Sequence, residues 1–141
     1  MAQPGMRDIK AGDELPPFTR TTDFRNWNRY AAVNDEFVPI HMDDEAGRAA
    51  GYPTAFGMGN LQWAYLHNLV RDWLGDSGAI VSLKCQFRAP NIKGMTVTAR
   101  GVVTAVREED GRRLADLDIW TEDDDGGAKL APGSAIVELL S

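Results

Sequence analysis

The stretch NLQWAYLHNLVRDWL, residues Asn60 to Leu74, decides the fold. Its apolar residues recur in steps of three and four, which is the spacing of one face of an α-helix: Leu61, Ala64, Tyr65, Leu69 and Trp73. Three more apolar residues widen that face, namely Leu66, Val70 and Leu74. A helix that is apolar over so much of its circumference has too little polar surface for the outside of a protein. The sequence therefore predicts one long helix wrapped by other structure and ended at Gly75–Gly78.

After this helix the pattern changes to the alternation of β-strands. Four segments are predicted to be strands: 80–87, 95–106, 114–121 and 134–140. In the first of them the alternation runs through Val81, Leu83, Cys85 and Phe87. Glu109–Gly111 and Asp123–Gly127 are predicted turns, and the aspartates of the second turn lack the ligand spacing of a calcium loop. These segments predict an antiparallel meander of about four strands.

The first half of the chain predicts a short strand and two small helices. Phe18–Thr21 alternates as a strand does, and Asp23 is a suitable N-cap for a helix that runs to Val33. A second short helix is predicted over 45–50. Together these patterns predict an α+β protein, a single domain over 1–141 in which an antiparallel sheet wraps around one long central helix.

Composition narrows the classes of function. The chain has 141 residues, of which 43% are hydrophobic, and this is enough apolar material for a folded core. Its net charge of -6, with basic residues scattered, argues against nucleic-acid binding. A single cysteine, Cys85, excludes an internal disulfide, and Met1–Lys10 lacks the apolar run of a signal peptide. No segment is long enough to cross a membrane, so we expect a soluble, cytoplasmic protein.

The segment NDEFVPIHMDD, residues Asn34 to Asp44, is crowded with groups able to transfer protons. It places Asp35, Glu36 and His41 around a turn that Pro39 stiffens. A carboxylate and an imidazole can take a proton from water and give one to a carbon atom. The aspartates at the end of the segment are read as carboxylates at the start of the second helix, where the helix dipole favours them.

Several segments of the chain are similar to one known family. The chain resembles the MaoC-like branch of the hot dog fold, which includes (R)-specific enoyl-CoA hydratases and acyl dehydratases. The resemblance spans nearly the whole length and rests on residues 29–32, 36–41, 46–51, 57–59, 72–75, 87–90 and 104–111. It implies a hot dog domain and an activity on acyl thioesters.

The resemblance also implies roles for particular residues. The family turn reads Asp, any residue, Asn, Pro, Ile or Leu, His, and here Glu36 and Val38 stand at the Asp and Asn positions. By this resemblance Glu36 and His41 hold and activate the water, and the backbone N–H of Gly59 binds the thioester oxygen. Asp35 takes the acid role instead if the turn is shifted by one residue.

Five further residues are candidates for substrate binding. Trp27 and Tyr30 either line the acyl pocket or pack in the core. Met58 stands where the family usually has a histidine, and Asn60 follows at the helix start. Arg88 either meets a phosphate of coenzyme A or is an exposed arginine at the end of a strand.

The expected function is reversible hydration of a 2-enoyl-CoA, which in reverse is dehydration of a 3-hydroxyacyl-CoA. The alternatives are an acyl-CoA thioesterase and a non-catalytic, acyl-binding subunit of a heteromeric hydratase. The resemblance implies no metal and no redox cofactor, and coenzyme A enters only as part of the substrate. An exposed sheet edge predicts a homodimer or a heterodimer with a related hot dog subunit.

Overall fold

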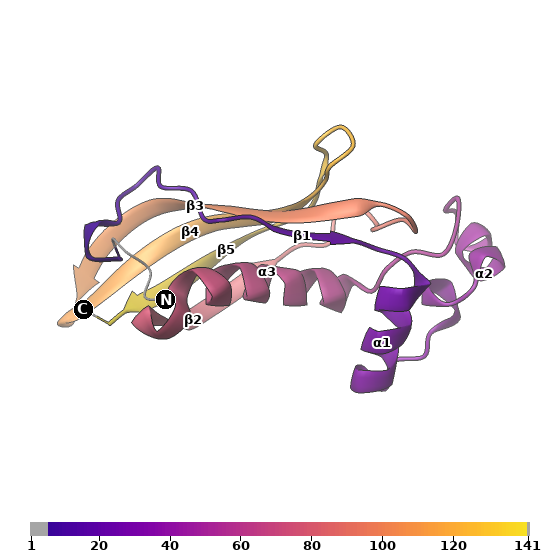
Figure 1. The fold of residues 1–141 in the computed structure, drawn as a ribbon, viewed down its shortest axis with the longest axis horizontal. Helices are drawn as coiled ribbons and strands as arrows, with labels where there is room; N and C mark the ends of the chain where they lie inside the picture. Colours follow the sequence, from indigo (N-terminus) through magenta and orange to yellow (C-terminus); the bar gives the residue numbers. More distant parts are fainter. Residues whose placement is uncertain (1–5, 141) are drawn as a thin grey trace.

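A computed structural model describes residues 6–140 of the chain, so the first part of the Met1–Lys10 segment lies outside the described residues. Five antiparallel strands form one sheet that curves along the long helix α3 (Gly59–Leu74), and α1 (Phe24–Asn34) and α2 (Asp44–Ala49) lie beyond one end of it (Figure 1). This arrangement confirms the predicted fold of a sheet around one central helix.

The sheet is made of β1 (Phe18–Thr21), β2 (Gly78–Cys85), β3 (Thr96–Glu109), β4 (Arg112–Asp123) and β5 (Lys129–Leu139), in the order β1-β3-β4-β5-β2. The predicted continuous meander is therefore wrong in one respect, because β2 pairs with β5 and not with β3. A hairpin loop has two to five residues as a rule, whereas residues 86–95 carry the chain from β2 across the sheet to β3.

The alternation predicted for β2 is also corrected. The pairing of β2 with β5 shifts between Ile80 and Ser82, so Val81 lies in a β-bulge and is exposed, at 47%. Phe87 lies beyond the end of the strand and is exposed at 53%. A bulge adds one residue to a strand and reverses the faces of the residues that follow it, which the simple alternation does not show.

The turns and caps follow from local chemistry. Asp23 forms a capping box with α1, in which its carboxylate accepts from the N–H of Arg25 and its own N–H donates to Asn26. The β3–β4 hairpin turns at Asp110 and Gly111, both with positive φ, which is the conformation of a two-residue hairpin loop. The N-cap at Asp23 and the hairpin turn confirm predictions from the sequence, whereas the reciprocal bond to Asn26 is seen only in the structure.

The hydrophobic core lies between α3 and the sheet. The residues of α3 that face it are Leu61, Leu66, Leu69, Val70, Trp73 and Leu74, all buried. Strand residues such as Val103, Leu117 and Val137 pack in the same cluster. Each fully buried aliphatic side chain stabilises the fold by roughly 1.5–3 kcal/mol, so this contact holds α3 against the sheet.

Candidate active site

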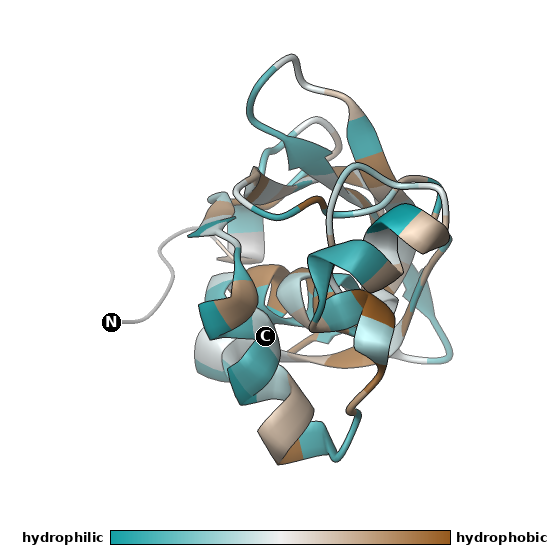
Figure 2. Ribbon diagram, turned by 90° about the vertical axis from the view of Figure 1, so that its right-hand side faces the viewer, coloured by the Kyte–Doolittle hydropathy of each residue, from teal (hydrophilic) through white to brown (hydrophobic). Residues whose placement is uncertain are grey.

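The turn at His41 joins α1 to α2, the two helices labelled at the right-hand end of Figure 1, and Figure 2 views the molecule from that end. Pro39 begins a short 3-10 helix, η2 (Pro39–His41), and His41 ends it. His41 is buried, with 8% of its surface exposed, and its Nδ1 lies 2.7 Å from the carbonyl oxygen of Phe56. Because a carbonyl only accepts hydrogen bonds, Nδ1 carries a proton and Nε2 is left free for proton transfer.

Glu36 and Asp35 point to different surroundings. Asp35 follows α1 in the left-handed conformation, with φ 52° and ψ 44°, and it is exposed. The N–H of Glu36 then donates to the carbonyl of Ala31 at 3.1 Å. Glu36 is half-buried, and its Oε2 is a buried atom with no hydrogen-bond partner among residues 6–140. Of the two acids, Glu36 is the one that faces the protein interior.

Tyr30 lies near Glu36, whereas Trp27 lies in the core. Burial, and then the negative charge of Glu36, raise the pKa of Tyr30 above its ordinary value. Trp27, one turn earlier on α1, is fully buried and meets the ring of Phe24 edge to face at 6.0 Å. Tyr30 is thus placed beside a predicted catalytic residue, and Trp27 packs in the core.

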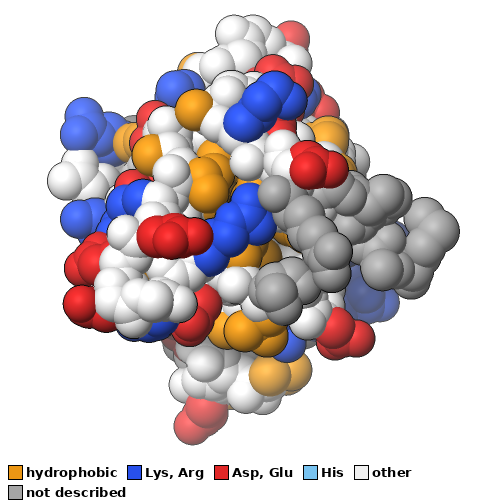
Figure 3. Space-filling model, turned by 90° about the vertical axis from the view of Figure 1, so that its left-hand side faces the viewer, with side chains coloured by type: hydrophobic (Ala, Val, Ile, Leu, Met, Phe, Trp, Pro, Cys, Tyr) orange, Lys and Arg blue, Asp and Glu red, His pale blue; other side chains and the backbone are white. Residues whose placement is uncertain are grey.

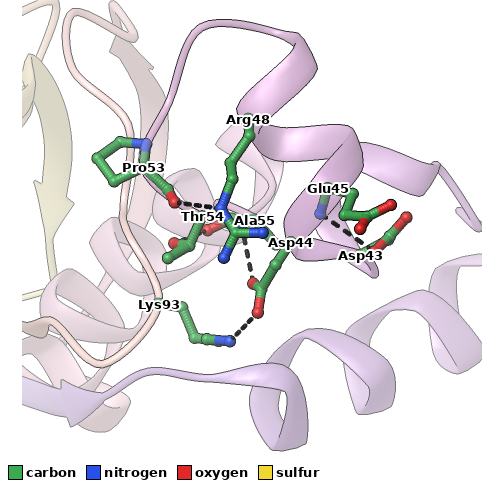
Figure 4. Close-up of polar contacts among 8 residues, drawn as sticks. All are labelled: Asp43, Asp44, Glu45, Arg48, Pro53, Thr54, Ala55 and Lys93. Atoms are coloured by element: carbon green, nitrogen blue, oxygen red, sulfur yellow. Dashed lines mark hydrogen bonds and ion pairs between the residues drawn. The ribbon is translucent and has the colours of Figure 1, made fainter.

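The carboxylates after the turn hold the local fold, as Figure 4 shows. Asp43 caps α2 by accepting from the N–H of Glu45 at 3.2 Å. Asp44 accepts from the N–H of Ala55 at 3.1 Å and forms an ion pair with Lys93 at 2.5 Å. The hydrogen bond from Lys93 is the main reason that the pKa of Asp44 is lowered. Both aspartates therefore have the structural roles that their position suggested.

The start of α3 presents backbone N–H groups without a side-chain cap. Met58, the N-cap residue, makes no capping hydrogen bond and is buried in the core. Gly59 is half-buried, and a Cβ at this position would lie 2.8 Å from the ring of Phe87. Asn60 is exposed. The first N–H groups of a helix have no partner within it and lie at the positive end of its dipole, so this glycine can donate to a ligand oxygen.

A cavity of about 240 Å³ opens beside this helix start. Its lining residues are Tyr52, Phe56, Gly57, Gly59, Gln62, Phe87, Arg88, Ala89 and Pro90. It brings together Gly59 and Arg88, and Phe56 connects it with His41 through the hydrogen bond to Nδ1. The exposed Arg88 also donates to Gln86 at 2.6 Å. Gly59 and Arg88 are the predicted site residues among its lining residues. The other predicted site residues do not line it: Trp27, Tyr30, Glu36, His41, Met58 and Asn60.

A larger hollow, of about 510 Å³, lies at the opposite end, where α3 passes into β2. Its lining includes the charged Arg71, Asp72 and Asp76 and contains none of the predicted site residues. Figure 3 shows this end of the molecule, where acidic and basic side chains surround small hydrophobic areas. We therefore place the candidate site at the smaller cavity, which is lined by the start of α3 and by Phe56, the hydrogen-bond partner of His41.

Sequence reasoning missed three polar residues near the cavity. Gln62 is buried on α3 and accepts from the hydroxyl of Thr121 at 2.6 Å. The ring of Tyr52 lies 4.5 Å from the ring of Phe56 and is tilted by 55° relative to it. Asn91 is buried, and its backbone carbonyl accepts a hydrogen bond from the N–H of Gly57 at 2.7 Å. Gln62 could have been noticed in the sequence, because it is a polar residue on the predicted buried face of the long helix. No pattern around Asn91 in the sequence indicates that it is buried near the site.

Two general findings apply to residues 6–140. Within them, no cluster of three or more His, Cys, Asp and Glu side chains is arranged to hold a metal ion. In the same part of the chain, no helix is both long and apolar enough to span a membrane.

Comparison with known proteins places the chain in a family. Residues 11–119 match the family described as MaoC like domain. An (R)-hydratase from A. caviae involved in PHA biosynthesis shares 24% identity with a TM-score of 0.84, covering 94% of this chain and 98% of that one. The ChsH1-ChsH2 complex from Mycobacterium tuberculosis gives 22% identity and a TM-score of 0.80, over 92% of this chain and 97% of that one.

A third similar structure is the HadBC (3R-hydroxyacyl-ACP dehydratase) complex from Mycobacterium tuberculosis, at 15% identity and a TM-score of 0.76, covering 94% of this chain and 99% of that one. A search of curated proteins gives no significant match. The structural similarities bear out the hot dog fold, and the family match covers most of the chain. The chain belongs to the MaoC-like domain family.

Proposed function

We propose that this protein is a hydro-lyase that reversibly adds water to a 2-enoyl thioester and forms the 3-hydroxyacyl thioester. Its family, with hydratases and dehydratases among the similar structures, supports this class of reaction. The observation that carries the proposal is the orientation of His41, whose Nδ1 is held by the Phe56 carbonyl at 2.7 Å. Glu36 precedes it by five residues and is half-buried, with one oxygen that has no hydrogen-bond partner within residues 6–140.

In the proposed mechanism, three groups divide the chemistry. Glu36 and His41 take a proton from water, whose oxygen bonds to C3, and deliver a proton to C2. The negative charge that develops on the thioester oxygen is stabilised by the N–H of Gly59 at the start of α3. Arg88, at the rim of the cavity, is suited to a phosphate of coenzyme A. The reaction uses only these protein groups, with coenzyme A as part of the substrate.

The test is incubation with crotonyl-CoA, with separate measurement of enoyl absorbance, free thiol and 3-hydroxybutanoyl-CoA. We expect the 3-hydroxyacyl product without thiol release. His41→Gln and Glu36→Gln are each expected to lower kcat roughly 100-fold or more, the usual contribution of a general acid or base. Asp35→Asn is the matched control, because the neighbouring carboxylate is exposed and asparagine tolerates positive φ.

Two outcomes would contradict the proposal of a hydratase. Thiol release without a hydroxyacyl product would identify a thioesterase. The double substitution Glu36→Asp and Val38→Asn restores the family turn. If activity on crotonyl-CoA appeared only in that double variant, the native chain would be a non-catalytic subunit with respect to this substrate. The departures at Glu36 and Val38 favour this second candidate, and the similar ChsH1-ChsH2 and HadBC structures are complexes of two named components.

We also propose that the protein works as a dimer joined through β2. This strand is an edge of the sheet, and Val81 in its bulge is exposed at 47%. Trp63 on α3 is 42% exposed. An edge strand with an exposed apolar side chain favours pairing with another sheet, from a second copy or a related hot dog subunit, and the exposed Trp63 adds apolar surface to be covered. Sedimentation of the pure chain distinguishes these, since a persistent monomer would rule out the homodimer.

A further inference from the structure

Gln62 is a buried polar side chain of α3 that reaches the cavity. It has 2% of its surface exposed, and it lines the cavity that contains Gly59. Its Oε1 accepts a hydrogen bond from the hydroxyl of Thr121 on β4 at 2.6 Å. Within residues 6–140 its Nε2 has no hydrogen-bond partner. A polar group of a buried side chain is as a rule bonded to protein, water or ligand, so the free N–H groups of Nε2 indicate a place for an acceptor.

The orientation of the Gln62 amide is set by Thr121. This threonine is fully buried, and among the described residues Gln62 is the acceptor for its hydroxyl proton. A reversed amide would turn an N–H group toward the threonine oxygen and leave that proton without an acceptor. The described residues contain three fully buried side-chain polar atoms without a partner, and Nε2 of Gln62 is not one of them, so solvent reaches it. Because Gln62 lines the cavity, this nitrogen faces into it.

The helix carries this donor toward the N–H of Gly59. Residues three apart lie on the same face of a helix, about 5–6 Å from each other. A helical side chain also leans back toward the N-terminus, over the turn that precedes its own residue. The amide of Gln62 is therefore directed toward the start of α3, where the N–H of Gly59 has no partner within the helix. One acceptor oxygen in the cavity can meet both donors.

The surroundings of the two donors favour an oxygen that gains negative charge. A Cβ at Gly59 would lie 2.8 Å from the ring of Phe87, so this ring packs directly against the glycine. Phe56 adds apolar lining, and Arg88 is the charged residue of the lining. Within residues 6–140 no carboxylate lines the cavity. Hydrogen bonds are stronger beside apolar groups than in water, and fixed donors stabilise charge that develops during a reaction.

We propose that Gln62 is a further catalytic residue, whose Nε2 donates to the thioester oxygen beside the N–H of Gly59. A carbonyl oxygen has two lone pairs and accepts both hydrogen bonds. As the water oxygen bonds to C3, an electron pair moves onto the thioester oxygen, and it returns to C2 when that carbon takes a proton. Thr121 is a positioning residue, because it holds the other end of the amide. The inference rests on the proposed function, since it assigns one more group to the same reaction.

The test is a double variant that keeps the packing and removes the donor. Gln62→Leu with Thr121→Val replaces both partners of the hydrogen bond by apolar groups of similar shape, which is nearly neutral for stability. In the hydration of crotonyl-CoA we expect kcat to fall about 100-fold with KM nearly unchanged, the effect of removing one donor to a developing oxyanion. Asn68→Leu is the matched control, because it makes the same change at an exposed position of α3 and should keep the wild-type kcat. A kcat close to the wild-type value in the folded double variant would overturn the inference.

A saturated thioester separates this inference from the proposed function. Butanoyl-CoA labelled with ¹³C at its carbonyl cannot be hydrated, and hydrogen bonds to the carbonyl oxygen move its ¹³C resonance downfield. We expect a larger downfield shift on the wild-type chain than on the double variant, and equal shifts would overturn the inference. A wild-type chain that shows the larger shift but does not hydrate crotonyl-CoA would support the second donor and contradict the hydratase. Failure to bind butanoyl-CoA would contradict both.

Discussion

The hydrogen bond between Gln62 and Thr121 joins the central helix to the middle of the sheet. The hydroxyl of Thr121 donates to Gln62 Oε1 at 2.6 Å, and the two residues are 0% and 2% exposed. Thr121→Val keeps the shape of the side chain and removes the donor. The substitution therefore leaves a buried carbonyl oxygen of Gln62 unpaired.

The size of the effect follows from this burial. Leaving one buried acceptor unpaired costs about 1–3 kcal/mol, whereas replacing both partners by apolar groups of similar shape is nearly neutral. Thr121→Val is thus expected to lower the free energy of unfolding by about 2 kcal/mol, a sizeable part of the ~5–15 kcal/mol of a typical domain. Adding Gln62→Leu to Thr121→Val should recover most of that lost free energy of unfolding. The double-mutant cycle should therefore give a favourable interaction energy of about 1–2 kcal/mol between the two residues.

Urea unfolding at one fixed protein concentration, followed by circular dichroism, measures all four proteins of the cycle. With a slope of about 2 kcal/mol/M, Thr121→Val should unfold at about 1 M less urea than the wild type. If the change in the free energy of unfolding in the double variant equalled the sum of the changes in the two single variants, the two side chains would not interact. The hydrogen bond would then contribute nothing specific to the contact between α3 and the sheet.

Three other predictions concern stability. Gly47→Ala should destabilise the fold by about 1–3 kcal/mol, because its Cβ would lie 2.0 Å from the carbonyl oxygen of Thr54, and unchanged thermal unfolding would refute this contact. The pKa of Asp44 is lowered in the folded protein, so its ion pair with Lys93 stabilises the fold fully at pH values above the ordinary carboxyl pKa of 3.8. This stabilisation is lost as the pH falls from there through the lower pKa that Asp44 has in the folded protein. Lys93→Met should therefore differ from the wild type in urea unfolding at pH 7 but converge with it in acid; a constant difference would contradict the pairing. Burial raises the pKa of Tyr65 to about 12, so folding stability should fall between about pH 10 and pH 12, and less steeply in Tyr65→Phe. Identical alkaline unfolding profiles would refute this last expectation.

Much of the fold could be predicted because it depends on neighbours in the chain. The three- and four-residue spacing of Asn60–Leu74 predicted α3, and Asp23 and Asp110–Gly111 predicted a cap and a hairpin. The proline and histidine of the family turn likewise located the candidate site, since Pro39 and His41 act through the local backbone. Patterns of this kind are set by helix and strand periodicity, which a sequence contains directly.

The side-chain environments at the site were decided by tertiary structure alone. Whether Asp35 or Glu36 faces inward depends on the left-handed residue that ends α1, and adjacent acids in a sequence do not show it. The bulge at Val81 depends on pairing with β5, about fifty residues later. Trp27 and Asn91 meet at Gly57 only because α1, the loop after β2 and the segment before α3 pack together. The sequence by itself determined the elements and the family turn, whereas long-range packing decided which side chains near that turn are buried and which are exposed.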